Sequence, residues 1–451
     1  MNLRKFGLIT LIASMGTVAF GASIDHIQNY TAEYNANMAQ QGAINATTSV
    51  YYNPAGLMRL KNGTYFTGGV QVAFGEETMK YDVKKYGTSN EYSADLAAPI
   101  PNFALFKKND DRAYFWTFGG IAGGGDLKYE DGFAGLKVLE DAYSKIPNIG
   151  PLLTAAKDNG SWAEGENMYA QTTIGTAWKV NDKLSLSAAG RIVYGWRNLK
   201  AHLDAKIGMT GFANGAPIIP VTADIDAERT AWGFGGQFGL NYAYDDTWNF
   251  AMRYDTKIKM EFEADTTSKP YTNPLVPNAS LGFESFFPQY ADGAKYRRDL
   301  PAILAVGASQ KITNRWTMFY GANYYFNESA KIDEDVPGYT NGIEYDNGWE
   351  ISLGTEYWLN EKWAVLGGIN YAKTGAKQKS FSDVEFAIDS TLVGIGVKYR
   401  PDEDTEWVVS TSHYFYESTD GTFSDKYGVN ANDQRYDKNI SSIGFSYTKK
   451  F

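Results

Sequence analysis

The stretch WGFGGQFGLNYAY, residues 232–244, contains the pattern that decides the fold. Small or polar residues fill every second position of this stretch. The positions between them carry the large apolar side chains Trp232, Phe234, Phe238, Leu240, Tyr242 and Tyr244. Strict alternation of apolar and polar residues over this length predicts a β-strand with two different faces.

The same alternation continues in the next segment, 247–263, and returns at 391–400. In a soluble sandwich the apolar faces would meet another sheet, and the ends of the strands would not differ from their middles. Here aromatic residues gather at the segment ends, as in the two aromatic girdles of a membrane barrel. The apolar face predicted for 247–263 consists of Trp248, Phe250, Met252, Tyr254, Ile258, Met260 and Phe262.

The connections between segments point to the same architecture. About fourteen alternating segments follow residue 63, and an even strand number is typical of bacterial barrels. Short and long connections alternate, as expected for short periplasmic turns and longer outer loops. The sequence therefore predicts an all-β, transmembrane antiparallel barrel over 63–451. The predicted long connections are 79–97, 123–166, 201–224, 264–296, 329–342, 377–385 and 420–436.

The N-terminal part of the chain differs from the rest. Residues 1–21 combine a basic start with an apolar run that is too short to span a membrane, which predicts a cleaved signal peptide. Residues 22–62 do not alternate. The chain of 451 residues has no cysteine, which excludes disulfides and thiolate metal sites, and no cofactor motif is evident. Its net charge of -10 argues against nucleic-acid binding.

The segment before the barrel carries a resemblance to a known family. Asn53-Pro54-Ala55-Gly56-Leu57 looks like the N-terminal hatch motif of the FadL family of outer-membrane transporters. Further similarities are DLPA at 299–302 and the hairpin WEISLGTEYWLNEKW at 349–363. The resemblance implies that 22–62 forms a hatch inside the lumen, with Asn53, Pro54, Ala55 and Gly56 as its gating residues.

The resemblance also implies a function and a location. The protein would be a channel in the outer membrane of a Gram-negative-type bacterium. It would take up hydrophobic molecules, above all long-chain fatty acids, by passive diffusion that ligand binding gates. The hatch would move, and the ligand would leave sideways into the membrane at a kinked third strand.

The third predicted strand contains the glycines for such an exit. Gly119, Gly120 and Gly123 lie in the sequence AYFWTFGGIAGGGD, and glycines inside a strand mark bulges or kinks. We expect a break in strand pairing near 118–124. The alternative is that the later glycines relieve crowding or open the following loop.

Two long outer loops offer apolar side chains to a ligand. In the first loop, apolar residues recur at helical spacing, and a later loop contains a group of phenylalanines. The alternative is that these side chains pack the loops against one another instead of contacting a ligand. The residues are Leu136, Leu139, Tyr143 and Ile146 in the first loop, and Phe283, Phe286 and Phe287 in the second.

A fatty acid also needs a cation for its carboxylate, and Arg or Lys in a shielded lumen would supply one. Alternate residues of a strand face opposite sides of the sheet, and we use this rule, which we call parity, to assign side chains to the two faces. By parity, Arg191 and Arg197 point into the lumen. Lys257 and Glu261 are assigned to the lumen face in the same way. The alternative is that these cations pair with lumen acids rather than with ligand.

Other functions and partners were weighed on the same residues. His26, His202 and His413 are the only histidines, and none has the surroundings of a catalytic base. A general porin or a surface adhesin on a barrel scaffold is the alternative function. Expected partners are outer-membrane lipids, lipopolysaccharide and, through the terminal Phe451, the barrel assembly machinery. We expect a monomer.

Overall fold

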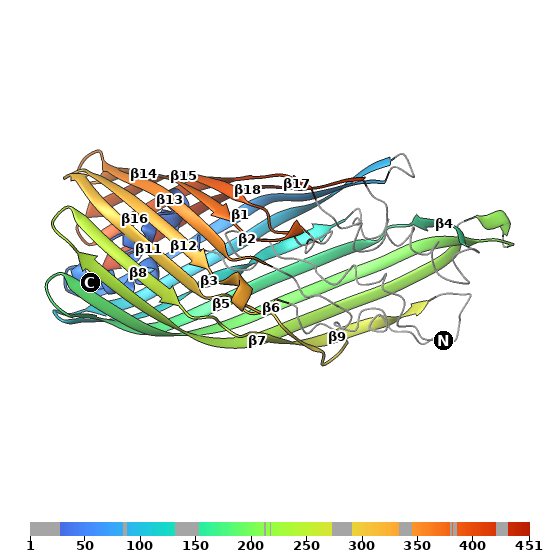
Figure 1. Ribbon diagram of the computed structural model, residues 1–451, viewed down its shortest axis with the longest axis horizontal. Coiled ribbons are helices and arrows are strands. Elements are labelled where there is room, and N and C mark those ends of the chain that lie inside the picture. The colour runs from blue at the N-terminus through green and yellow to red at the C-terminus, as the bar shows by residue number, and fades with distance from the viewer. Residues whose placement is uncertain are drawn as a thin grey trace.

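The structure is a computed structural model. It describes residues 28–83, 88–130, 153–272 except 212 and 217, 291–332, 345–378, 381, 386–420 and 432–451. The strands form one closed antiparallel sheet, in which β1 pairs with both β2 and β18 (Figure 1). The strands are β1 Gly63–Val83, β2 Thr88–Lys108, β3 Arg112–Tyr129, β4 Leu153–Asp158, β5 Trp162–Lys179, β6 Leu184–Met209, β7 Ile219–Ala243, β8 Trp248–Asp255, β9 Glu261–Thr272, β10 Lys295–Arg297, β11 Ile303–Thr313, β12 Trp316–Tyr325, β13 Gly348–Trp358, β14 Trp363–Lys373, β15 Ser390–Asp402, β16 Thr405–Tyr416, β17 Thr419–Asp420 and β18 Asn432–Lys450.

Several of these 18 segments lie end to end within one barrel strand. β4 continues β5 along β6, β9 continues β8 along β7, β10 continues β11, and β17 continues β16 along β18. The barrel therefore has 14 strands, as the sequence predicted.

The alternation separates an outer face from a lumen face. Trp232 and Phe234 of β7 are 63% and 69% exposed, and Ile395 of β15 is 62% exposed. Their strand neighbours on the other face are small or polar. Apolar side chains on the outside of a closed barrel match a lipid environment, so the predicted transmembrane arrangement of faces is confirmed.

Two predicted long connections were wrong. Most of 79–97 belongs to β1 and β2, and most of 201–224 belongs to β6 and β7. Figure 1 shows β6 and β7 continuing well beyond β11 and β12 at the long-loop end. These extensions have polar residues on their outer face, because no lipid selects apolar ones there. The apolar alternation on which the prediction depended therefore stops before the strands do.

The predicted strand 247–263 is interrupted, which corrects its face assignment. β8 ends at Asp255 and β9 begins at Glu261. Ile258 and Met260 have no exposed surface and point into the lumen, although parity placed them outside. Lys257 and Glu261 are turned outward in exchange. The irregular segment between β8 and β9 inverts which residues face the lumen. The alternation of apolar and polar residues in the sequence continues unchanged across this segment, so the sequence does not reveal the inversion.

The described N-terminal segment, residues 28–60, lies inside the barrel near the short-turn end (Figure 1). We call these residues the plug. Almost all of the plug is buried. Among the described residues, no helix is long enough and apolar enough to cross a membrane. The helical elements of the plug are α1 Ala32–Ala36, η3 Gln40–Gly42, α2 Ser49–Tyr52 and η4 Pro54–Arg59.

Candidate functional site

The plug rests on a belt of glycines along one half of the barrel wall. A Cβ built on Gly394 would overlap the carbonyl oxygen of Asn35, and one on Gly368 would lie 2.9 Å from the Cα of Asn37. Only residues without side chains let α1 and η3 approach the wall so closely. The glycine belt consists of Gly307, Gly321, Gly354, Gly368, Gly394, Gly396 and Gly444 on strands β11 to β15 and β18.

The NPAGL motif fastens the other end of the plug to β6 and β7. Asn53 caps η4, because its Oδ1 accepts from the Gly56 amide at 3.2 Å, and Pro54 occupies the first turn. The Asn53 Nδ2 donates to Asn241 Oδ1 of β7 at 2.8 Å. Ser185 of β6 donates to the Ala55 carbonyl at 2.7 Å. All four predicted hatch residues therefore lie in the plug and in contact with one another or the wall, whereas their role in gating stays a prediction.

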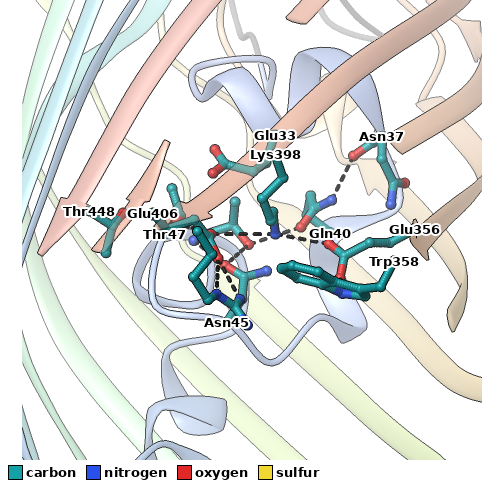
Figure 2. Close-up of polar contacts among 12 residues, drawn as sticks. Glu33, Asn37, Gln40, Asn45, Thr47, Glu356, Trp358, Lys398, Glu406 and Thr448 are labelled. Atoms are coloured by element: carbon teal, nitrogen blue, oxygen red, sulfur yellow. Dashed lines mark hydrogen bonds and ion pairs between the residues drawn. The ribbon is translucent and has the colours of Figure 1, made fainter. Parts of the chain in front are cut away.

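A buried charge cluster ties the plug to the wall near the short turns (Figure 2). Lys398 Nζ lies 2.8 Å from Glu356 Oε2 and 3.4 Å from Glu406 Oε1. Thr47 of the plug donates to Glu406 Oε1 at 3.0 Å. Figure 2 shows Glu33 of α1 beside this cluster, and Glu33 accepts from Ser446 Oγ at 3.1 Å. Lys398 points into the lumen, where it forms ion pairs with two acids of the wall.

The buried carboxyl of Glu33 predicts that the stability of the folded protein depends on pH. Burial raises the pKa of Glu33 from its ordinary 4.5 to about 7, and attraction to Lys398 offsets only part of that rise. The folded protein therefore keeps a proton on Glu33 that the unfolded chain has already lost. The stability that this proton contributes is complete below about pH 4.5 and is lost as the pH rises to about 7, a change of about 3 kcal/mol.

We expect Glu33→Gln to remove this pH dependence. The amide stays neutral at every pH, so the variant should match the wild type at pH 5 and unfold at a higher temperature than the wild type at pH 8. The midpoint of heat-modifiable migration on gels, measured at both pH values, reports the difference. If the variant and the wild type lose stability equally between pH 5 and pH 8, Glu33 is not the group responsible.

The strand pairing between β2 and β3 is interrupted. The two strands pair from Lys108/Ala113 up to Asn102/Gly119, and pairing resumes only at Ala97/Asp126. The predicted break in pairing near 118–124 is confirmed. We call this unpaired stretch the gap.

The predicted glycines border the gap. Gly119 is the last paired residue below it, and Gly120 and Gly123 lie within it. On its other side β3 pairs with β5 through register shifts at Gly120/Ala122 and Gly123/Gly125. Gly123 has φ +107, a left-handed conformation that disfavours any side chain.

Two prolines on β2 also explain the gap, and sequence reasoning missed them. Pro99 and Pro101 lack the N–H group that a strand ladder needs. The pairing of β2 with β1 is continuous through both prolines, so no N–H group is missing on that side of β2. The positions at which the two prolines lack an N–H group therefore face β3. A Pro-Ile-Pro sequence inside an alternating segment was the available signal, because proline is excluded from positions that are paired on both sides.

A small pocket connects the plug with the gap. Its cavity measures about 20 Å³, room for a water molecule but not for an acyl chain. In this state the path between lumen and gap is therefore closed. The pocket is lined by Tyr30, Val50 and Tyr51 of the plug, by Phe118, Gly119 and Ile121 of β3, and by the wall residues Thr117, Gln171, Thr173 and Gln237.

Arg191 stands beside this pocket. Its Nε donates to Gln171 Oε1 at 2.9 Å, and its Nη1 donates to the Thr256 carbonyl at 3.4 Å. Both acceptors are neutral, and within the described part of the chain Arg191 forms no ion pair. The Asp255 carboxylate also lies close enough to attract Arg191, without forming an ion pair with it. A buried guanidinium whose hydrogen bonds all go to neutral groups can accept an anion in a charge-assisted, bidentate contact.

The other lumen arginines differ in their surroundings. Arg253 pairs with Asp255 at 3.1 Å and donates to the Tyr51 carbonyl at 2.9 Å, so it supports the plug. Arg197 is turned inward and buried like Arg191, as predicted, but lies higher in the barrel.

The predicted loop contacts cannot be placed. Leu136, Leu139, Tyr143 and Ile146, and likewise Phe283, Phe286 and Phe287, lie outside the described residues. Within the predicted long connection 123–166, the chain at Leu153–Asp158 is strand β4, because it pairs with the long extension of β6.

The two histidines within the described residues contact side chains of neighbouring strands. His202 Nδ1 lies 2.6 Å from Asp224 Oδ1 across β6 and β7, and His413 Nδ1 lies 2.8 Å from Ser441 Oγ. Ser412 points to the opposite face from His413, where it donates to Asn35 of the plug. His26 lies outside the described residues.

A closed barrel with a lipid-facing outer surface, a plug seated in its lumen and a gap in its wall defines a plugged outer-membrane barrel. Residues 154–451 match the family model described as "Outer membrane protein transport protein (OMPP1/FadL/TodX)". The chain therefore belongs to this family of outer-membrane transporters of hydrophobic compounds.

Similar proteins span almost the whole chain. The Long-chain fatty acid transport protein of Escherichia coli K12 is 21% identical over 430 residues, which cover 91% of this chain and 88% of that protein. An Outer membrane protein P1 of Haemophilus influenzae is 22% identical over 425 residues, which cover 88% of this chain and 87% of that protein. Some matches are local, and one to another Outer membrane protein P1 of Haemophilus influenzae covers 36% of that protein.

Two solved structures show the same fold. A Pseudomonas aeruginosa FadL homologue has a TM-score of 0.67 and 15% identity, covering 97% of this chain and all 100% of its own. The Pseudomonas putida toluene transporter TodX has a TM-score of 0.60 and 17% identity, covering 95% and 100%.

Proposed function

We propose that this protein takes up hydrophobic molecules, foremost long-chain fatty acids, by passive diffusion that ligand binding gates. The ligand enters the lumen from the long-loop end, reaches the pocket at the plug and leaves sideways through the gap into the membrane. The observation that carries this proposal is the position of the pocket, which lies between side chains of the plug and an unpaired stretch of wall. An unpaired wall in lipid is costly unless it borders a pathway or cavity.

The movement of the hatch is proposed to be local. Where α1 and η3 rest on the glycine belt, backbone touches backbone, and displacing them would break many close contacts. On the opposite side, Tyr30 and Tyr51 face the pocket, and the Tyr51 hydroxyl reaches Asn102 only at 3.4 Å. We expect these tyrosines to swing aside for the ligand while the seated part of the plug stays in place.

A general porin is the less well supported function. A porin needs an open, water-filled lumen. In this barrel the plug fills the lumen near the short turns and is held there by the charge cluster and the NPAGL motif.

Fatty acids are favoured among hydrophobic ligands because Arg191 lies beside the pocket. A carboxylate could replace the weak contact of Arg191 with the Thr256 carbonyl and gain a bidentate ion pair in a shielded site. A neutral hydrocarbon would gain nothing from the charge.

We expect Arg191→Gln to lower the affinity for palmitate about tenfold, the loss of a charge-assisted hydrogen bond. Binding of hexadecanol, which has the same chain and no charge, should change little. Titration of the purified protein with each ligand measures both affinities, and Arg315→Gln in the exposed turn after β11 is the control. Unchanged palmitate affinity in the Arg191 variant would remove this residue from the site.

The maturation and partners of the protein are proposed on the sequence features. Residues 1–21 would be removed as a signal peptide, leaving 22–62 as the hatch and 63–451 as the barrel. Phe451, whose side chain is 76% exposed, is the proposed contact for the barrel assembly machinery. Lipopolysaccharide and membrane lipids would surround a monomeric barrel.

A further inference from the structure

Three neighbouring strands bring a group of side-chain oxygens together on the outside of the barrel. Asn198 of β6 lies directly between Glu166 of β5 and Glu228 of β7 in the cross-strand register. Asn198 points outward, because its neighbours along β6, Arg197 and Leu199, are buried on the lumen side. Directly opposed residues have Cβ atoms about 5 Å apart, so both carboxylates can reach over the amide. We call Glu166, Asn198 and Glu228 the outer oxygen cluster.

The amide oxygen of Asn198 is unsatisfied. The residue is only 8% exposed, and within the described part of the chain its buried Oδ1 accepts no hydrogen bond. A buried acceptor without a donor costs about 1–3 kcal/mol. The two flanking glutamates cannot supply the donor, since ionised carboxylates only accept hydrogen bonds. A cation bound between the three side chains would satisfy this oxygen.

The two carboxylates of the cluster also lack a cation of their own. Among the described residues, neither Glu166 nor Glu228 forms an ion pair, and the nearby Lys200 is engaged by Glu164 at 3.8 Å. Asp126 of β3 is the direct cross-strand partner of Glu166, and like charges at such positions destabilise a sheet. A bound counterion would relieve this repulsion.

The outer oxygen cluster lies at the upper boundary of the lipid-facing surface. The outward positions of β5, β6 and β7 carry no charge from the short-turn end up to Met168, Trp196 and Thr230. Trp196 stands next to Asn198 on this face, and tryptophans at such positions mark the interface between lipid and water. The cluster is therefore at the level of the headgroups of the outer leaflet, whose lipopolysaccharide carries phosphates.

We propose that the outer oxygen cluster binds a divalent cation, whose coordination a phosphate of lipopolysaccharide completes. Ca²⁺ and Mg²⁺ prefer carboxylate and amide oxygens, and Mg²⁺ commonly combines one or two carboxylates with phosphate oxygens and water. Among the described residues, no three acidic or histidine side chains converge into a metal site. The cation at the cluster therefore depends on the Asn198 oxygen and on the lipid for the rest of its ligands.

The cluster stands beside the upper end of the gap. Asp126 is the residue of β3 at which pairing with β2 has resumed, and Glu166 lies directly opposite it on β5. A lipopolysaccharide held here would border the place where the gap meets the outer leaflet. The inference does not depend on the proposed transport, because the cation and the phosphate bind on the outside of the barrel.

The first test measures binding of Ca²⁺ to the intact purified protein in a nonionic detergent. Tb³⁺ replaces Ca²⁺ as the probe, because its luminescence is excited through a nearby tryptophan such as Trp196, and Ca²⁺ then displaces it. We expect Glu166→Gln/Glu228→Gln to weaken Ca²⁺ binding about tenfold or more, and Asn198→Ala about threefold or more. Unchanged affinity in either variant overturns the site.

A second acidic pair provides the matched control. Glu76 of β1 and Asp95 of β2 are exposed on the outer face and directly opposed. Glu76→Gln/Asp95→Asn removes the same charge away from Asn198 and should leave Ca²⁺ affinity at the wild-type value. A loss in this control equal to that of the cluster variant would overturn the site, because any acidic pair would then serve. Heat-modifiable migration shows that each variant forms the barrel, and Asn198→Ala decides if the double variant does not.

The second test identifies the source of the phosphate. Lipid A is titrated onto the protein in Ca²⁺ and in EDTA. We expect the wild type to bind lipid A about tenfold more tightly in Ca²⁺, and Glu166→Gln/Glu228→Gln to lose this difference. Lipid A without its phosphates should bind equally in both solutions. If inorganic phosphate displaces lipid A at equal concentration, free phosphate is the ligand and the assignment to lipopolysaccharide is overturned.

Discussion

Closing the gap with a disulfide should stop uptake. In the variant Ile100→Cys/Gly120→Cys, a Cβ on residue 120 lies 3.5 Å from the Cγ2 of Ile100, close enough for an S–S bond after a small adjustment. The bond would join β2 to β3 across the stretch where Pro99 and Pro101 leave the wall unpaired. We expect the oxidised variant to take up labelled oleate at least tenfold more slowly in a transporter-null strain, because the ligand has no other proposed exit.

One property of the sequence makes the result of this experiment easy to interpret. The chain has no cysteine, so the engineered pair is the only possible disulfide, and a reductant should restore uptake in the same cells. The control is Lys107→Cys/Tyr114→Cys, two exposed cross-strand partners at the short-turn end of β2 and β3, where the strands are already paired. Oxidation of the control should leave uptake near the wild-type rate. Normal uptake through the oxidised Ile100/Gly120 variant would exclude a lateral exit at this gap.

Filling the glycine belt should open the barrel. In Gly368→Val/Gly394→Val, the new side chains would occupy the space of the α1 backbone, which cannot yield as a flexible side chain can. Overpacking of this kind costs about 1–3 kcal/mol at each site, and unseating α1 is the way to relieve it. The barrel itself should persist, because its ladder of backbone hydrogen bonds is not touched. We expect single-channel conductance in planar bilayers to rise at least tenfold as water fills the vacated lumen.

A neighbouring glycine provides the matched control. Gly367 precedes Gly368 on β14 but points to the other face, and its nearest neighbour, the Gly394 carbonyl oxygen, lies 3.8 Å away. Gly367→Val should therefore conduct like the wild type. If the double variant also conducts like the wild type while heat modification shows an intact barrel, the glycine belt does not seat the plug.

Much of the barrel follows from the sequence because its two faces meet different surroundings. Lipid outside and polar groups inside select different residues at alternate positions, so Trp232, Phe234 and Ile395 could be assigned to the outer face without coordinates. The same rule predicted that Arg191 and Arg197 point into the lumen. The glycines of the third strand predicted the break in strand pairing. The rule fails where lipid is absent, as in the long extensions of β6 and β7.

The candidate site depends on contacts between residues that are far apart in the sequence, and a local sequence pattern does not predict such contacts. The parity error at Lys257 came from an irregular segment that inverts the faces without disturbing the alternation. The position of Asn198 between Glu166 and Glu228 depends on the register of three strands, and only closure of the whole sheet sets that register.

The sequence by itself determined the class of fold, the number of strands and the faces of the membrane-spanning ones, because each of these is a local response to lipid or water. Only the tertiary structure decided which glycines seat the plug, that the prolines of β2 face β3, and that Arg191 stands beside the pocket. These features join residues far apart in the chain, and their energies depend on contacts that exist only once the barrel is closed.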